Sequence, residues 1–364
     1  MTASQTFAAE NLVPDVAQSL GAVRVWLWSV LGLVFLMVLV GGATRLTESG
    51  LSITEWKPIT GALLPLSEAA WLVEFEKYKQ IPQYSQLFPT MTLAQFKTIF
   101  FWEWGHRLLG RIIGLAFALP LFWFAIRGVV RGALLAKLVC VLALGGLQGA
   151  VGWWMVVSGL VGRVEVAPER LAVHLLLASL TFMALIWIVL DLKPASRREM
   201  PAAPIRRQST QLMWLVLFQI VLGALVAGSR AGLSYNTWPL MDGNFVPPLD
   251  NLLRMSPWWL NFLENITAIQ FQHRMIAYFV IAFTIWHAWS ASKAMPGSPA
   301  ARRSWAIASI TLVQAGLGIA TLLLAQGKLP IHLALTHQAV AFILLAMTVI
   351  HAKRLRESPE PVRP

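Results

Sequence analysis

The sequence predicts an all-α integral membrane protein with eight transmembrane helices. Of its 364 residues, 57% are hydrophobic and only 13% are charged, roughly half the charged fraction of an average soluble domain. The mean hydropathy is +0.63, and runs of about 20 apolar residues, long enough to cross a bilayer, recur along the whole chain. This composition excludes a soluble enzyme, a disordered chain and a free-standing nucleic-acid binder.

The predicted spans follow from the positions of these apolar runs, which basic or mixed polar segments separate. Between the first two runs, residues 66–100 mix aromatic and charged side chains, a pattern typical of short amphipathic helices that cover one end of a bundle. The spans predicted from the apolar runs cover residues 25–43, 106–127, 135–157, 171–192, 211–229, 272–291, 304–325 and 331–352.

The Lys and Arg residues indicate how the helices are oriented. The chain carries 29 of them against 17 Asp and Glu, which gives a net charge of +12, and more than half lie in short segments between spans or near the chain ends. Because short basic loops stay in the cytoplasm, we expect both termini inside and the long loops 44–105 and 230–271 outside. The N-terminal residues resemble neither a signal peptide nor a transit peptide, which favours a bacterial plasma membrane.

An internal repeat organises the chain. The tripeptide Gly50-Leu51-Ser52 recurs as Gly232-Leu233-Ser234, which is 182 positions later. The segment Glu103-Trp104-Gly105-His106-Arg107 recurs as Gln270-Phe271-Gln272-His273-Arg274, at an offset of 167. Spans one to four are therefore repeated as spans five to eight in the same orientation.

Parallel repeats of this kind are a known membrane architecture. We expect two tandem four-helix bundles, residues 25–192 and 211–352, related by a pseudo-two-fold axis along the membrane normal. Residues 1–24 would form a cytoplasmic segment, residues 193–210 a cytoplasmic linker and residues 353–364 a cytoplasmic tail.

Four histidines occupy matching places in the two halves. His106 and His174 lie at the starts of spans two and four, and His273 and His337 at the starts of spans six and eight. Ionisable side chains are costly inside a membrane and therefore mark functional positions. Since histidines from two facing helices can supply both axial ligands of a haem, the sequence predicts a bis-histidine haem site near the outer end of each bundle. A hydrogen-bonded packing role is the alternative for each histidine.

Other metal centres fit the pattern less well. Zinc needs three or four His, Cys or carboxylate ligands, whereas each bundle offers one histidine pair and the sole cysteine, Cys140, lies in span three. A di-iron site needs Glu-x-x-His on two helices together with further carboxylates. Here Glu103-x-x-His106 has Gln270 in place of glutamate in its copy.

Glu103 distinguishes the two halves. It lies three residues before His106, so the two side chains share a helix face. Its repeat position holds the neutral Gln270. An acid that is kept in only one copy indicates chemistry in the N-terminal half and a supporting cofactor in the other half. The alternative is an interfacial glutamate without a chemical role.

Arg107 and Arg274 each follow a candidate ligand by one residue. An arginine at the outer edge of a bundle could hold a haem propionate through a bidentate contact, and the alternative is a side chain that reaches the lipid headgroups. Arg111, one turn beyond Arg107, has no basic counterpart in the second half, and we expect it to reach the headgroups.

Two further functions compete with this interpretation. His287 and His351 lie 14 residues after His273 and His337, about 21 Å along a helix, so a second bis-histidine haem would make the protein an electron-transfer cytochrome b. The first half has no such histidines, and we expect His287 and His351 to be ordinary interface residues. A transporter could also be built from repeats, but the span centres carry almost no charge. Gly145-Gly146 is better explained by close helix packing.

Taken together, these features resemble the haem A synthase family. The resemblance extends over essentially all of residues 25–352. In that family, a membrane enzyme oxidises the ring methyl of haem O to the formyl group of haem A, for insertion into haem–copper oxidases. Beyond the eight spans in two halves, the matching segments are Thr44-Arg45-Leu46-Thr47-Glu48-Ser49-Gly50-Leu51-Ser52, Glu103-x-x-His106-Arg107, Leu147-Gln148-Gly149 and Tyr235-Asn236-Thr237-Trp238-Pro239-Leu240-Met241-Asp242-Gly243.

The resemblance also implies roles for individual residues. His273 and His337 would be the axial ligands of a bound haem b in the C-terminal half. His106 and His174 would hold the substrate haem, with Glu103 as the catalytic acid.

The resemblance further implies partner proteins and the branch of the family to which the chain is similar. Haem O would be delivered by haem O synthase, an electron donor of unknown identity would be a further partner, and haem A would go to subunit I or assembly factors of a haem–copper oxidase. Some members carry a cysteine pair in the first outer loop. Because Cys140 is the sole cysteine, the chain is similar to the cysteine-free branch found in proteobacteria and mitochondria.

Overall fold

Long helices dominate the structure, a computed structural model that describes residues 3–192 and 203–356. Within those residues the secondary structure is helical, without a β-strand element, and eight helices are long and apolar enough to cross a membrane. The prediction of an all-α, eight-span membrane protein is confirmed. The long helices are α1 (Ala3–Leu46, apolar from Leu20), α4 (Leu93–Ile126), α5 (Gly132–Leu160), α6 (Pro168–Asp191), α7 (Ala203–Ser229), α9 (Ile266–Ala294), α10 (Pro299–Leu323) and α11 (Ile331–Arg356).

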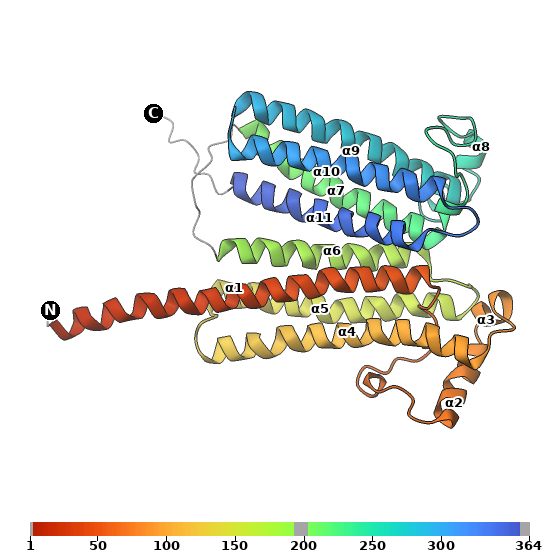
Figure 1. The fold of residues 1–364 in the computed structure, drawn as a ribbon, viewed down its shortest axis with the longest axis horizontal. Coiled ribbons are helices and arrows are strands. Elements are labelled where there is room, and N and C mark those ends of the chain that lie inside the picture. Colours follow the sequence, from red (N-terminus) through yellow and green to blue (C-terminus); the bar gives the residue numbers. More distant parts are fainter. Residues whose placement is uncertain (1–2, 193–202, 357–364) are drawn as a thin grey trace.

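The shorter elements lie in the long loops. Figure 1 shows that these loops gather at one end of the molecule, which we call the loop end, whereas the other connections between neighbouring helices are short. The short elements are η1 (Thr60–Ala62), α2 (Glu68–Lys79), α3 (Pro82–Leu87), η2 (Ala231–Leu233), α8 (Leu249–Leu252) and η3 (Trp258–Phe262).

Local signals in the sequence start several of these helices. At the start of α4, the Thr92 hydroxyl accepts a hydrogen bond from the main-chain N–H of Gln95. The Gln95 side chain accepts one from the main-chain N–H of Thr92, which completes a capping box. Ser67 caps α2 in the same way without the return bond. Pro168 and Pro299 occupy the first turns of α6 and α10, where the missing N–H costs nothing.

The helices form two groups that lie side by side. Helices α1, α4, α5 and α6 pack in one ring and α7, α9, α10 and α11 in another, and the groups meet where α6 contacts α7 and where α1 and α6 contact α11. The division into these groups agrees with the repeat in the sequence. The pseudo-two-fold axis stays a prediction.

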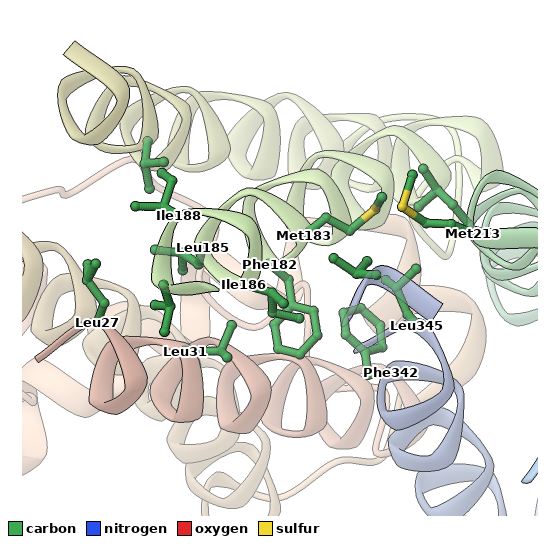
Figure 2. Packing of buried hydrophobic residues seen from close by; sticks show 14 of the residues in the cluster. Leu27, Leu31, Phe182, Met183, Leu185, Ile186, Ile188, Met213, Phe342 and Leu345 are labelled. Atoms are coloured by element: carbon green, nitrogen blue, oxygen red, sulfur yellow. The ribbon is translucent and has the colours of Figure 1, made fainter. Parts of the chain in front are cut away.

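The main hydrophobic core lies at the seam between the two groups. Figure 2 shows Leu27 and Leu31 of α1 facing α6, and Phe182 of α6 beside Phe342 of α11. The two phenylalanine rings meet edge to face with their centroids 5.4 Å apart. Because Phe182 and Phe342 follow the histidines of α6 and α11 in the chain, this core lies farther from the loop end than the histidines do.

Residues 47–92 form a folded cap over the start of α4. The cap has its own hydrophobic core, in which the fully buried Tyr78 of α2 packs on Phe96 of α4. The Tyr78 hydroxyl donates to Gln83 Oε1 at 2.9 Å. Burial, with added repulsion from Glu48 and Glu103, raises the pKa of Tyr78. The expectation of short helices between residues 66 and 100 is confirmed.

The spans differ from the predicted ones at several boundaries. Helix α4 begins at Leu93, so His106 lies inside the helix rather than at its start, because Phe96 and Phe100 extend the helix beneath the cap. Helix α7 begins at Ala203, inside the predicted linker 193–210, because Ile205 and Ser209 are buried. The rest of that linker, residues 193–202, lies outside the described residues, as does most of the predicted tail.

The expectation that Gly145-Gly146 marks a close helix contact is wrong. A Cβ atom built at either glycine meets no atom within 4 Å. Both residues are exposed in the chain, so close packing within this chain does not explain them.

Candidate functional site

The four predicted ligand histidines each lie against a glycine of a neighbouring helix. All four rings are half-buried, and a Cβ atom added to the glycine would approach the ring to within ordinary contact distance or closer. The absence of these Cβ atoms makes room for the imidazole rings inside the bundles. The pairs are Gly41–His106, Gly152–His174, Gly223–His273 and Gly318–His337, with closest approaches of 3.1, 3.0, 3.3 and 2.8 Å.

Glutamine side chains lie within hydrogen-bond distance of the rings of His174, His273 and His337. Gln148 Nε2 lies 3.2 Å from His174 Nδ1, and Gln219 Nε2 lies 3.1 Å from His273 Nδ1. No hydrogen bond among the described residues reaches the ring of His106, and the first-half position that matches Gln219 holds a methionine, Met37. The glutamines were not assigned a role from the sequence, although Gln148 recurs there as Gln314.

His337 shows that the donor set suits haem iron. Its Nδ1 atom lies 3.1 Å from the main-chain carbonyl oxygen of Gln314, an arrangement in which Nδ1 carries the proton and donates it. Nε2 then carries the lone pair that an axial ligand requires, and its present partner is the Gln314 side-chain amide, whose Nε2 atom lies 3.3 Å away. The neutral side chains around the ring add no charge that would compete with a metal.

Glu103 is buried beneath the cap and accepts hydrogen bonds on both carboxylate oxygens. Its Oε2 atom accepts from the Ser52 hydroxyl and from the main-chain N–H of Ile53, each at 2.8 Å. Its Oε1 atom accepts from Arg107 Nη2 at 2.6 Å and from Nε at 3.1 Å. The side chain is only 3% exposed. This arrangement holds a carboxylate in one orientation, one turn before His106.

Ser52 is a site residue that sequence reasoning missed. It belongs to the repeated tripeptide Gly50-Leu51-Ser52, and that repeat was the available signal. Its contact with Glu103 joins residues 51 positions apart and depends on how the cap folds back on α4.

Arg107 and Arg274 make the same main-chain contacts in the two halves. Each guanidinium donates to carbonyl oxygens of the loop that precedes its helix, and two of these oxygens lie at positions related by the offset of 182. Arg274 also contacts the carbonyl oxygen of Leu240 at 3.4 Å. Arg107 contacts Glu103 in addition, and Arg274 has no such partner because Gln270 replaces the glutamate. The carbonyl partners are Ile53 and Glu55 for Arg107, and Tyr235 and Thr237 for Arg274, at 2.8, 3.0, 2.6 and 2.9 Å.

The neutral side chain of Gln270 connects the outer loop of the second half to α9 by hydrogen bonds. Its Nε2 atom donates to the carbonyl oxygens of Ala231 and Tyr235 at 3.0 and 3.3 Å. An amide at this position cannot accept a proton as a carboxylate can. The two halves therefore share a scaffold and differ at the residue that could take part in proton chemistry.

The expectation that Arg111 reaches the headgroups is wrong. Its Nη2 and Nε atoms donate to the carbonyl oxygens of Lys57 and Pro58, both at 2.8 Å. Like Arg107, it ties the cap to α4. Loop carbonyls without partners are strong acceptors, and this explains why they capture the arginine.

His287 and His351 form neither a second haem site nor an interface pair. Both are almost fully buried, at 0% and 1% exposure, and their Nε2 atoms lie 2.9 Å apart in a direct hydrogen bond. Two iron–nitrogen bonds of about 2 Å each need roughly 4 Å between the nitrogens, so iron does not fit between them. Gln208 Oε1, 3.2 Å from His287 Nδ1, extends the pair into a polar network.

Fold and site together define a multi-span membrane protein with a histidine pair in each half and a buried carboxylate beside only one of them. The sequence profile of the family described as cytochrome oxidase assembly protein matches residues 24–349, and the chain belongs to this family. Relatives named heme A synthase match between 92% and 98% of this chain.

Three of these relatives come from different bacteria. A heme A synthase of Bradyrhizobium sp. (strain BTAi1) is 55% identical over 336 residues, 92% of each chain. One of Beijerinckia indica is 52% identical over 360 residues, 98% of this chain and 99% of the relative. One of Agrobacterium fabrum is 54% identical over 340 residues, 93% of this chain and 92% of the relative.

Proposed function

We propose that this protein is a haem A synthase, a membrane oxidoreductase that converts the ring methyl of haem O to the formyl group of haem A. The observation that carries the proposal is Glu103, a buried carboxylate fixed by Ser52, Ile53 and Arg107 one turn from His106. The family to which the chain belongs and the names of its relatives support the same function.

The two histidine pairs have separate tasks in this proposal. His273 and His337 hold haem b as a resident cofactor, and His106 and His174 hold haem O as the substrate. A bound haem b supplies one-electron chemistry beside the substrate site. The glycines beneath all four rings support this arrangement, because they leave each ring the space to face the bundle interior.

Glu103 is the residue of this chain that handles protons. Oxidation of a methyl to a formyl group removes hydrogen from carbon, and a carboxylate beside the reacting group can accept a proton or stabilise developing positive charge. Ser52 and the Ile53 amide fix Oε2, and Arg107 fixes Oε1. Because the cap covers these groups, it also shields the carboxylate from water. Arg107 and Arg274 are further candidates for contact with haem propionates, in addition to their bonds to loop carbonyls.

The location follows from the helices and the charge pattern. The eight apolar helices make a multi-pass membrane protein, and the bacterial relatives favour a plasma membrane. By the distribution of Lys and Arg, the loop end with its histidine pairs faces outward and both termini face the cytoplasm. The partners in this proposal are haem O synthase, an electron donor of unknown identity and a haem–copper oxidase or its assembly factors.

The test is the substitution Glu103→Gln, which keeps the size of the side chain but removes the proton acceptor. We expect haem A formation to be abolished while haem b stays bound at His273 and His337. Glu76→Gln, on the exposed face of α2, is the control and should leave haem A formation unchanged. Normal haem A from Glu103→Gln would refute the assignment.

A further inference from the structure

At the loop end, two oppositely charged residues at matching repeat positions join the two halves. Glu48 and Arg230 are related by the offset of 182, and they form an ion pair in which Glu48 Oε1 lies 2.8 Å from Arg230 Nη2. Glu48 follows the end of α1 and Arg230 follows the end of α7, and both helices end at the loop end in Figure 1. Each half therefore contacts the other through the same position of the repeat.

Both residues have a left-handed backbone conformation. The φ angle is +57° at Glu48 and +52° at Arg230, values that are uncommon for a residue other than glycine. Glycine would adopt this conformation at less cost, yet each half has a charged residue here. The two turns therefore accept backbone strain where these side chains meet, which indicates that the ion pair contributes more than the shape of a turn.

Glu165, in the connection between α5 and α6, extends the pair into a network. Its carboxylate forms ion pairs with Arg230 and with Arg45 in the last turn of α1. Arg45 also donates to the carbonyl oxygen of Gly228 at 3.2 Å. The four charged side chains are between 16% and 32% exposed, so solvent screens the network less than it screens a fully exposed pair.

The end of α7 that presents Arg230 is tightly packed. Gly228 lies against Pro168 of α6, and a Cβ atom at Gly228 would come within 2.8 Å of Pro168 Cα. Leu225 and Ala231, on either side of this contact in the chain, are buried in the same apolar cluster. Arg230 therefore extends toward Glu48 from a fixed point at the seam.

The turn that carries Glu48 is also the turn that holds Glu103. Ser49 is fully buried, and its carbonyl oxygen accepts a hydrogen bond from the main-chain N–H of Ser52 at 3.2 Å. The Ser52 hydroxyl and the Ile53 N–H in turn donate to Glu103 Oε2. A short and largely buried turn thus connects the ion pair at the seam with the carboxylate beside His106.

We propose that Arg230 is a positioning residue for Glu103 that acts across the seam between the two halves. Its effect passes through Glu48 and the following turn to Ser52. The proposal rests on the proposed function, in which Glu103 handles protons at the substrate site. The orientation of the acid in one half then depends on a side chain of the half that holds haem b. The four histidines lie on other helices, so both haem sites keep their ligands when this ion pair is lost.

The test measures haem A formation by the full-length, haem b-loaded protein at increasing concentrations of haem O. In Arg230→Gln, we expect the maximal rate to fall about tenfold, while the haem O concentration for half-maximal rate stays within about twofold, as for an interaction that acts in the transition state. Haem b content should not change. Arg230→Lys should be faster than Arg230→Gln because it keeps the charge. Glu48→Gln, which opens the same ion pair from the other side, should lower the rate as Arg230→Gln does.

A double-mutant cycle shows whether the effect passes through Ser52. If Arg230 acts through the Ser52 contact, the double variant Arg230→Gln/Ser52→Ala should be at most about twofold slower than the slower single variant. Arg163→Gln is the matched control. Arg163 pairs with Glu264 of the other half at 3.3 Å, at an exposed position of the connection that carries Glu165, and its loss should leave the rate unchanged.

Three outcomes would overturn the proposal. One is a native rate in Arg230→Gln, and another is a loss in the double variant equal to the product of the two single losses, because Arg230 and Ser52 would then act independently. The third is loss of haem b from Arg230→Gln, which would make the role of Arg230 purely structural. Failure of the proposed function is distinguishable, because the native chain itself would then form no haem A.

Discussion

The glycines beneath the histidines provide the sharpest structural prediction. A Cβ atom at position 318 would lie 2.8 Å from His337 Cε1, whereas ordinary contact begins at 3.4 Å. In Gly318→Ala the imidazole must therefore move by about 0.6 Å or more. Metal–ligand distances tolerate only about 0.2 Å, so the ring can no longer serve as an axial ligand in its present position.

The expected effect is a loss of haem rather than a loss of fold. Alanine is favoured over glycine in a helix interior by up to about 1 kcal/mol, so α10 itself should not be weakened. We expect haem b binding to weaken about tenfold, as for a cost of about 1.4 kcal/mol. Haem b per chain in the purified protein measures this, with the helical circular dichroism as a check of the fold.

The chain supplies matched controls for this experiment. Gly316→Ala lies on the same helix, where the new Cβ atom meets nothing within 4 Å, and should keep full haem b. Gly223→Ala, with its Cβ atom 3.3 Å from His273, should have a smaller effect than Gly318→Ala. Full haem b with an unchanged absorption spectrum in Gly318→Ala would refute the reasoning, as would an equal loss in Gly316→Ala.

Two further predictions concern groups outside the haem sites. His287 and His351 bond directly to each other, so His351→Leu should lower the thermal stability of the protein. The content of haem b should stay at one per chain. Loss of that haem would contradict the assignment of its ligands to His273 and His337. The buried Tyr78 hydroxyl has a pKa raised above its ordinary value of 10, so its contribution to cap stability is intact below pH 10 and is lost as the pH rises further. In an alkaline titration, the difference in tyrosinate absorbance between the native chain and Tyr78→Phe should appear only above pH 10, and a difference that is complete by pH 10 would argue against a buried Tyr78.

The eight spans and the paired histidines were predictable because each depends on local or repeated sequence. An apolar run of 20 residues satisfies its backbone hydrogen bonds as a helix wherever it lies in the bilayer. The histidines stood out because His106 and His273 recur with their neighbours at one offset. The exchange of Glu103 for Gln270 was visible for the same reason.

The contacts of the arginines with the cap were not predictable, because they depend on the path of the loops. Arg107 was expected to face a propionate, which stays a prediction, and Arg111 the headgroups. The structure adds carbonyl oxygens more than 50 positions away in the chain as partners of both arginines. Which carbonyls a loop leaves without partners is set by the folded cap, which has no periodic pattern in the sequence.

The buried pair His287 and His351 was misjudged for a related reason. Basic residues after His351 and a tryptophan before His287 are typical of an interface, but the two helices turn the rings toward each other. Gln208 contacts His287, and Ser304 lies within hydrogen-bond distance of both rings. Spacing along one helix places a residue on a face, and only the packing of the neighbouring helices decides what that face meets.

The haem extracted from membranes that contain this chain and a supply of haem O tests the central claim most directly. With the native chain, the extract should contain haem A, identified by its formyl group, and with His106→Ala it should contain haem O without haem A. Haem O that stays unchanged in the presence of the native, haem-loaded protein would contradict the account.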